Sequence, residues 1–262
     1  MADRDEVTGV LAVVCALFGL AIGSFLNVVI YRVPRKESVV HPRSRCPQCD
    51  TQLRSIDNVP VVSWLLLGGR CRTCKGKVSA RYPVVELTTA ALFAGAALRF
   101  GASWELPGFC LFFAALLALA LIDLEHFLLP NKIIYPTLLA SIPLLLVAAA
   151  AGHQWDHLRG AVIGSLAAFA VFFLLNLVYP RGMAFGDVRL SAVIGLYLGW
   201  IGPRTLFVGL FLGFLTASVV GIGLIVARRA NRKTPVPFGV FLAIGAGIAV
   251  FAGGPVIRWW LD

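Results

Sequence analysis

The chain has 262 residues, of which 59% are hydrophobic and 14% charged, and its formal net charge is +10. A soluble domain carries about a quarter charged residues. This composition excludes an ordinary soluble enzyme and indicates a helical protein that crosses a membrane several times. Positive charge can also indicate nucleic-acid binding, but membrane topology accounts for it here, and we expect no nucleic-acid partner.

Eight apolar runs are near the length of about 20 residues that a helix needs to cross a bilayer. We therefore predict an all-α polytopic membrane protein with about eight transmembrane helices. The third and sixth runs are short and adjoin acidic residues, so we expect their ends to lie inside the protein rather than in lipid. The first run is too long for the core of a signal peptide, about 7–15 residues, and we interpret it as an uncleaved span. The predicted spans are 7–31, 84–100, 107–122, 132–151, 159–179, 188–202, 204–227 and 238–260.

The basic residues are distributed unevenly along the chain. Segment 32–83 holds 11 Lys or Arg against three acidic residues, and segment 228–233 adds four more. With eight spans, both segments fall on one side of the membrane, together with the loops 123–131 and 180–187. The positive-inside rule makes that side cytoplasmic. We therefore expect a multi-pass protein of a bacterial inner membrane, with both termini outside the cytoplasm.

The segment 32–83 is the one sizeable stretch outside the apolar runs. It separates a first transmembrane helix (1–31) from a transmembrane core (84–262). It contains two Cys-x-x-Cys pairs with 21 residues between them, which is a spacing typical of a four-thiolate zinc site. A segment this small needs such a staple, and four thiolates leave no open position for catalysis, so we predict a structural zinc ion. The predicted ligands are Cys46, Cys49, Cys71 and Cys74.

The alternative for these cysteines is a pair of disulfides or redox-active dithiols, although disulfides are rare in the cytoplasm. In the first span, Gly19 and Gly23 form a GxxxG pattern, which indicates close helix packing. Ser24 and Asn27 lie on one face of the same helix. They could bond to a neighbouring helix or line a site.

Two aspartates lie at the ends of apolar runs. Asp123 follows the run 111–122, and Asp187 precedes a run that starts near Leu190. A carboxylate at a membrane boundary is costly to bury, which favours a functional role. The simpler alternatives are a helix end reaching water for Asp123 and a helix N-cap for Asp187. The macrodipole disfavours negative charge at a helix C-terminus, which argues against the first. Two acids on one side suggest a pair that shares a proton and activates water, as in aspartyl proteases.

An ordered set of motifs covers nearly the whole chain. It consists of GSFLNVVIYR at 23–32, RCPQC at 45–49, Trp64, RCRTC at 70–74, SARYPVVEL at 79–87, LID at 121–123, LLP at 128–130, GD at 186–187 and PFG at 237–239. In this set the chain resembles the bacterial prepilin peptidases, which are GxGD-type membrane aspartyl proteases. These enzymes remove the leader peptides of type IV pilins and of type II secretion pseudopilins.

The resemblance implies that Asp123 and Asp187 are the catalytic pair. The four-cysteine segment is similar to that of the long form of the family, which is often bifunctional. Such members cut the leader after a glycine and then N-methylate the new amino terminus, using S-adenosylmethionine as methyl donor. Prepilins or pseudopilins are then the expected substrates, with membrane lipid around them. The segment 32–83 has no glycine-rich loop of the GxGxxG type, so the residues that bind the methyl donor stay unassigned.

The chain departs from the family pattern at three positions. The first glycine of GxGD is Ala184, the acid that often follows LLP is Asn131, and the usual lysine after GDx is Arg189. Arginine keeps the charge of lysine but changes its geometry. We expect these departures to affect rate or substrate range rather than the type of reaction.

The expected mechanism is that of a coupled carboxyl pair. One aspartate, ionised, takes a proton from water, while the other, protonated, donates to the scissile carbonyl. Which of the two is the base stays open. One alternative is a non-catalytic membrane scaffold or small transporter with a zinc-bound module, in which the acids would be helix caps or an ion site. Another is a peptidase of this type with a substrate other than a pilin.

Overall fold

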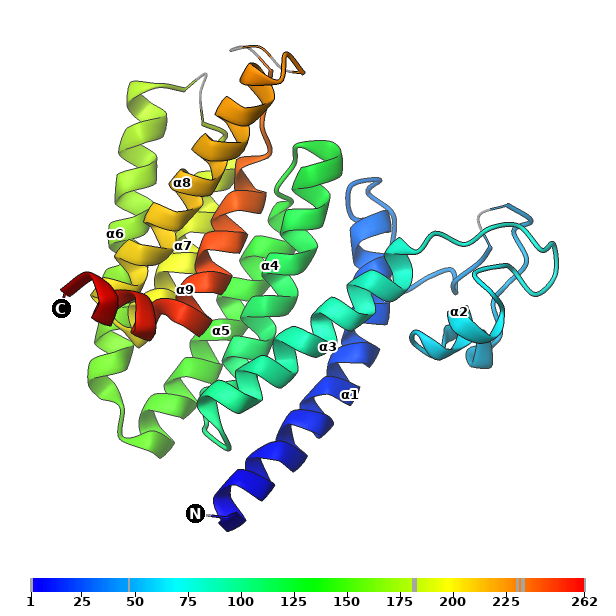
Figure 1. The fold of residues 1–262 in the computed structure, drawn as a ribbon, viewed down its shortest axis with the longest axis horizontal. Coiled ribbons are helices and arrows are strands. Elements are labelled where there is room, and N and C mark those ends of the chain that lie inside the picture. The colour runs from blue at the N-terminus through cyan, green and yellow to red at the C-terminus, as the bar shows by residue number, and fades with distance from the viewer. Residues whose placement is uncertain (1, 47, 181–182, 230, 232–233, 262) are drawn as a thin grey trace. The chain divides into compact units, whose positions relative to one another are not determined.

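The computed structural model describes residues 2–46, 48–180, 183–229, 231 and 234–261. Across this part of the chain the named elements are all helical, so the predicted all-α class is confirmed, and each predicted span coincides with a long helix (Figure 1). In chain order the elements are α1 (Ala2–Arg32), the 3-10 helix η1 (Ser55–Asn58), α2 (Val62–Leu66), α3 (Arg81–Phe100), α4 (Leu106–His126), α5 (Asn131–Gly152), α6 (Trp155–Val178), α7 (Phe185–Ile201), α8 (Pro203–Val226) and α9 (Phe238–Leu261).

Six of these helices are long and apolar enough to cross a membrane, namely α1, α3, α4, α5, α6 and α8. The third predicted span is longer than expected, because α4 begins at Leu106 and continues past the apolar run to His126. The sixth is short as predicted: α7 has 17 residues, and most of its side chains are buried. In α9 the apolar stretch of the described residues is Phe238–Ala252.

The chain forms two compact units, Met1–Ala102 and Ser103–Asp262. In the first unit, α1 packs against α3 in antiparallel register. A Cβ added at Gly19 would lie 2.7 Å from the Cα of Ala90, and one at Gly23 would lie 2.7 Å from the Cα of Glu86. The GxxxG pattern therefore marks a close helix contact, as predicted. The domain boundaries predicted at residues 31 and 83 separate membrane from soluble segments and stay a prediction.

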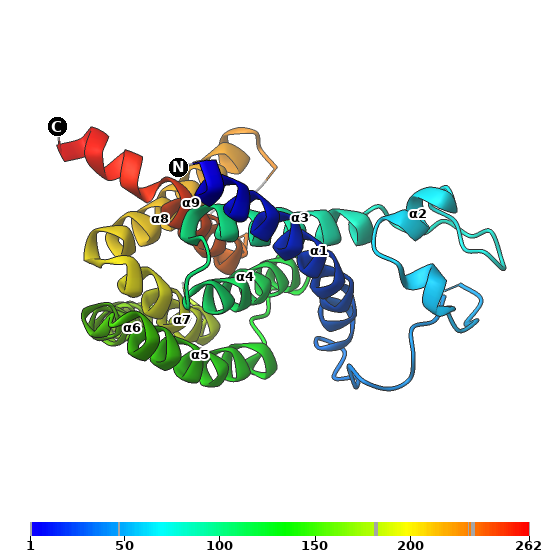
Figure 2. The ribbon, with the colours of Figure 1, turned by 90° about the horizontal axis from the view of Figure 1, so that it is seen from below.

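In the second unit, α7 is the central helix and contacts α4, α5, α6, α8 and α9 (Figure 2). Its closest neighbour is α6, and glycines face one another across this contact. A Cβ added at Gly164 would lie 2.5 Å from the carbonyl oxygen of Gly195, and one at Gly160 would lie 2.6 Å from that of Gly199. Small residues thus allow the two backbones to touch, which holds α7 and its first turn in a fixed place.

Candidate functional site

Asp123 lies in the last turn of α4, where its carbonyl oxygen accepts the backbone N–H of Phe127. Its side chain is only 6% exposed. A negative charge at this end of α4 would be unfavourable, but a second helix compensates for it. The backbone N–H groups of Gly239 and Val240, in the first turn of α9, interact favourably with the carboxylate. The Oδ2 atom is buried without a hydrogen-bond partner, so it has free capacity for a ligand.

Asp187 is the third residue of α7 and is 5% exposed. The N-cap of α7 is Ala184, three residues before Asp187. The interpretation of Asp187 as the N-cap is therefore wrong. The backbone N–H of Asp187 donates to the carbonyl oxygen of Ala184 at 3.0 Å, and the carboxyl interacts with the backbone of Ala184. This resembles half of a capping box, in which an acid at N3 turns back toward the N-cap.

The two acids belong to one site in the second unit, because the carboxyl of Asp123 acts electrostatically on that of Asp187. Leu129 connects their surroundings. A Cβ added at Gly186 would lie 2.9 Å from the Cβ of Leu129, and one at Gly239 would lie 3.0 Å from its Cδ2. The leucine of the LLP motif is therefore wedged between the first turns of α7 and α9, and it fixes both turns against the end of α4.

Arg189 follows Asp187 by two residues in α7, and its partner lies in another helix. Its guanidinium donates to Oδ1 of Asn131 at 2.6 Å and lies 4.6 Å from the ring centre of Phe185. Two of the three departures from the family pattern are thus partners. Asn131 keeps an acceptor where an acid was expected, and the pair joins the start of α5 to the first turn of α7.

The four predicted metal ligands meet in the first unit. The two Cys-x-x-Cys pairs form equivalent backbone turns. The N–H of Asp50 donates to the carbonyl of Cys46, and the N–H of Lys75 donates to that of Cys71. Asp50 and Lys75, each following a second cysteine, both have a positive φ, of 54° and 59°. The chain therefore builds the same knuckle twice, and each knuckle presents two sulfur atoms.

The sulfur atoms fit a metal ion. The ligand atoms of all four cysteines lie within 4.8 Å of one another, and the Sγ atoms of Cys46 and Cys74 are 3.8 Å apart. A tetrahedral ion with metal–sulfur bonds of about 2.3 Å requires sulfur atoms about 3.8 Å apart. Hydrogen bonding to the hydroxyl of Thr51 lowers the pKa of the Cys49 thiol to about 6, and backbone N–H groups lower the pKa of Cys71. None of the four cysteines is paired in a disulfide, so all four sulfur atoms are available to a metal ion.

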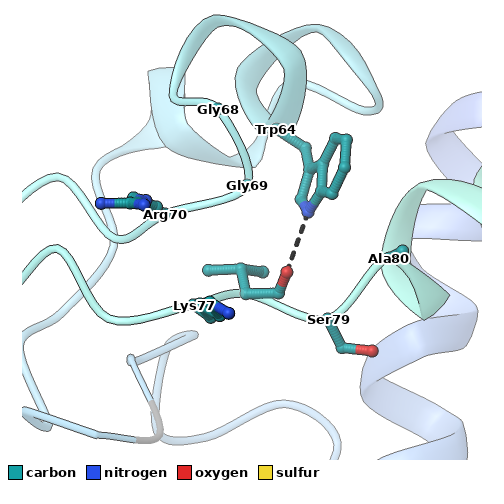
Figure 3. A pocket seen from close by; sticks show the side chains of 8 residues that line it. Trp64, Gly68, Gly69, Arg70, Lys77, Ser79 and Ala80 are labelled. Carbon is teal, nitrogen blue, oxygen red and sulfur yellow. Dashed lines mark hydrogen bonds between the residues drawn. The ribbon is translucent and has the colours of Figure 1, made fainter.

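Trp64 is a half-buried residue of α2 that lies close to these knuckles. Its indole N–H donates to the carbonyl oxygen of Val78 at 3.1 Å (Figure 3). Its ring covers Gly69, where a Cβ would lie 2.9 Å from Cζ2. With φ at +65°, Gly69 also adopts a backbone conformation that suits glycine. The ring thereby ties α2 to the strand-like stretch that leads into α3.

Sequence reasoning identified the acids and the cysteines but gave no role to several groups that the fold places beside them. The amides of Gly239 and Val240 and the side chain of Leu129 contribute to the site of the acids. The sequence does contain a hint of the amides. A proline just before a helix, followed by glycine in the first turn, leaves backbone N–H groups free to meet an anion.

Two family models match the chain. The bacterial peptidase A24 N-terminal domain matches residues 17–100, and the type IV leader peptidase family matches residues 110–227. The first match falls in the unit that holds the four cysteines, and the second spans both aspartates. No solved structure matches the chain.

Curated relatives match over most of the chain. It is 36% identical to the prepilin leader peptidase/N-methyltransferase of Stutzerimonas stutzeri, over 95% of this chain and 94% of that protein. Proteins of the same name are 38% identical in Dichelobacter nodosus, over 92% of this chain and 91% of that protein, and 40% identical in Myxococcus xanthus, over 85% and 66%. Together with the family models, these matches lead to one conclusion: the chain belongs to the type IV leader peptidase family.

Proposed function

We propose that this protein is a membrane-embedded aspartyl endopeptidase that removes the leader peptide of type IV prepilins or type II secretion pseudopilins and then N-methylates the new amino terminus. The names of the relatives support both activities. The observation that carries the peptidase is the burial of two interacting carboxyls, Asp123 and Asp187, at one end of the helix bundle. Among the described residues neither carboxyl has a basic partner, and a buried acid pair of this kind suits a shared proton.

In the proposed mechanism, both carboxyls lie at helix N-termini that stabilise a negative charge: Asp123 faces the first turn of α9, and Asp187 lies in the first turn of α7. One carboxylate removes a proton from water, and the water attacks the scissile carbonyl. The protonated partner donates to the carbonyl oxygen. When the intermediate collapses, the proton passes to the leaving amine, and the pair returns to its singly protonated state.

We further propose that Cys46, Cys49, Cys71 and Cys74 hold a structural zinc ion, since the geometry of the four sulfur atoms suits a closed tetrahedral site. S-adenosylmethionine would supply the methyl group. The basic residues of segment 32–83 favour the cytoplasmic side for this segment and for the acids. A leader peptide made in the cytoplasm would meet the acids there.

Co-expression with candidate prepilins tests this proposal. We expect the wild-type chain to release the leader and to leave a methylated amino terminus, and Asp187→Ala to leave the prepilin intact, as read by mass spectrometry of the pilin. Wild-type processing by Asp187→Ala would overturn the peptidase and favour a scaffold or transporter. An unmethylated but cleaved pilin would remove the second activity alone. If the enzyme cleaved a non-pilin protein and left prepilins intact, the proposal that its substrates are prepilins would be wrong.

A further inference from the structure

A cavity of about 1230 Å³ lies within the first unit, between the ends of α1 and α3 and the cysteine-containing segment. Ligand sites usually enclose about 300–1,000 Å³, so this space can hold a nucleoside-sized ligand together with the end of a peptide. Its walls include residues of α1, α3 and both knuckles. The aspartate pair belongs to the other unit.

Glu86 is an unusual feature of the cavity wall. It lies in α3, a helix apolar enough to span a membrane, and is 6% exposed. An acid in such a position is costly and marks a function more often than a structural need. Its Oε2 atom accepts the backbone N–H of Val61 at 2.7 Å, and the hydroxyl of Ser24 lies beside its carboxyl.

The backbone bonded to Glu86 is strained. Val61 has φ at +59°, a conformation that β-branched residues almost never adopt. Strain of this kind persists where the surroundings enforce it and often accompanies a binding or catalytic site. Here the strained residue donates its N–H to a buried carboxylate, and this bond holds Glu86 in the cavity wall.

The rest of the wall combines aromatic rings with basic side chains, among them Arg32, Arg45 and Arg70. The rings suit an aromatic base, and the basic groups suit a carboxylate such as that of an amino acid. The rings of Tyr31, Trp64 and Tyr82 line the same cavity. Asn27 also lines it, and its side-chain amide donates to the carbonyl oxygen of Tyr82 at 3.1 Å. Aromatic rings can stack with a purine, and a sulfonium ion is attracted both by ring faces and by a carboxylate.

We propose that this cavity binds S-adenosylmethionine together with the newly released amino terminus, and that Glu86 is the base of the methyl transfer. The inference rests on the methyltransferase activity proposed above. The carboxylate of Glu86 takes one proton from the terminal ammonium. The nitrogen lone pair then forms a bond to the methyl carbon while the carbon–sulfur bond breaks, and its electron pair stays on sulfur as a neutral thioether. The products are the methylated ammonium, the thioether and protonated Glu86, so atoms and charges balance.

Glu86→Gln tests the base in the full-length protein. Glutamine keeps an oxygen that can accept the Val61 N–H, but it cannot take a proton. We expect the rate of methylation of a cleaved pilin to fall at least about 100-fold, in line with the usual contribution of a general base. Leader cleavage is measured in the same reaction as a readout of folding. Glu6→Gln is the matched control, since Glu6 is an exposed acid of α1 that does not line the cavity, and it should methylate as the wild type does.

Photocrosslinking locates the donor independently of activity. Purified protein is irradiated with S-adenosylmethionine that carries a tritiated methyl group, and the labelled peptide is identified. Label in peptides that contain Tyr31, Trp64 or Tyr82, in wild type and in Glu86→Gln alike, is the expected result. Label confined to residues 103–262, or equal methylation by Glu86→Gln and wild type, would overturn the inference alone. A wild-type protein that cleaves prepilin but neither binds the donor nor methylates would overturn the methyltransferase proposal itself.

Discussion

The carboxyl of Asp123 lies against the first turn of α9 because the residue that meets it there has no side chain. A Cβ added at Gly239 would lie 2.9 Å from Oδ2 of Asp123 and 3.0 Å from Leu129. Both contacts are tighter than ordinary van der Waals packing allows. The glycine of the PFG motif is thus explained by the approach of an acid to backbone N–H groups.

Gly239→Ala should therefore displace the carboxyl of Asp123 and lower the rate of leader cleavage about tenfold or more, which corresponds to about 1.4 kcal/mol of activation free energy. Gly247→Ala is the matched control in the same helix, where an added Cβ meets nothing within 4 Å. Initial rates on a purified prepilin compare the two variants. Equal rates would show that the contact between Gly239 and Asp123 does not position the acid.

The Ala184 departure from the GxGD pattern is expected to matter little. Ala184 has φ at −72° and ψ at 147°, a conformation open to any residue, so glycine is not required. Ala184→Gly should leave the cleavage rate unchanged and lower the stability of the protein by about 0.5–1 kcal/mol, because glycine loses more backbone entropy on folding. Thermal unfolding in detergent and cleavage rates measure these effects. A large gain in cleavage rate would contradict this and show that the methyl group of Ala184 slows the reaction.

The helix that carries Asp187 is held by backbone contact with α6, and this contact depends on glycine. Gly164→Val should push α6 and α7 apart, since its Cβ would lie 2.5 Å from the carbonyl oxygen of Gly195. We expect a loss of about 1–3 kcal/mol in stability and slower cleavage. Gly221→Val, at a position of α8 where nothing lies within 4 Å, controls for the helix propensity of valine. Equal melting temperatures for the two variants would contradict this account of the α6–α7 contact.

The positions of the helices were predicted well from the sequence, and the contacts between their ends less well. Within the described residues each apolar run lies in a helix, and six of these helices are long and apolar enough to cross a membrane, because a run of this length has few alternatives in a membrane. The end of α4 was missed, since polar residues after Asp123 continue the helix to His126. The amides of α9 and the Arg189–Asn131 pair could not be predicted, because they depend on which helix ends meet in space. The spacing within each Cys-x-x-Cys pair is a local feature of the sequence. The four-cysteine cluster could therefore be predicted.

The two proposed sites fall in different units of one chain. The unit Met1–Ala102 holds the cysteine cluster and the cavity at Glu86, and the unit Ser103–Asp262 holds the acid pair. The two family matches, residues 17–100 and 110–227, follow the same division. This arrangement suits an enzyme whose second reaction acts on the product of the first.

Metal analysis tests the proposed staple of the first unit. Purified wild-type protein should contain about one zinc ion per chain, because four thiolates form one closed site. Cys71→Ser should lose the ion and destabilise the segment around it, whereas Cys15→Ser, a change outside the cluster in α1, should keep it. Full zinc content in Cys71→Ser, or none in the wild type, would contradict a zinc site made by these four cysteines.

The most direct test of the account is leader cleavage by purified protein carrying Asp123→Asn or Asp187→Asn. Asparagine keeps the size of each side chain but cannot exchange the proton that the pair must share, so each variant should cleave a prepilin at least about 100-fold more slowly than the wild type. Asp156→Asn, at an exposed position of α6, should cleave at the wild-type rate. Cleavage at the wild-type rate by either of the first two variants would contradict the central role of the acid pair.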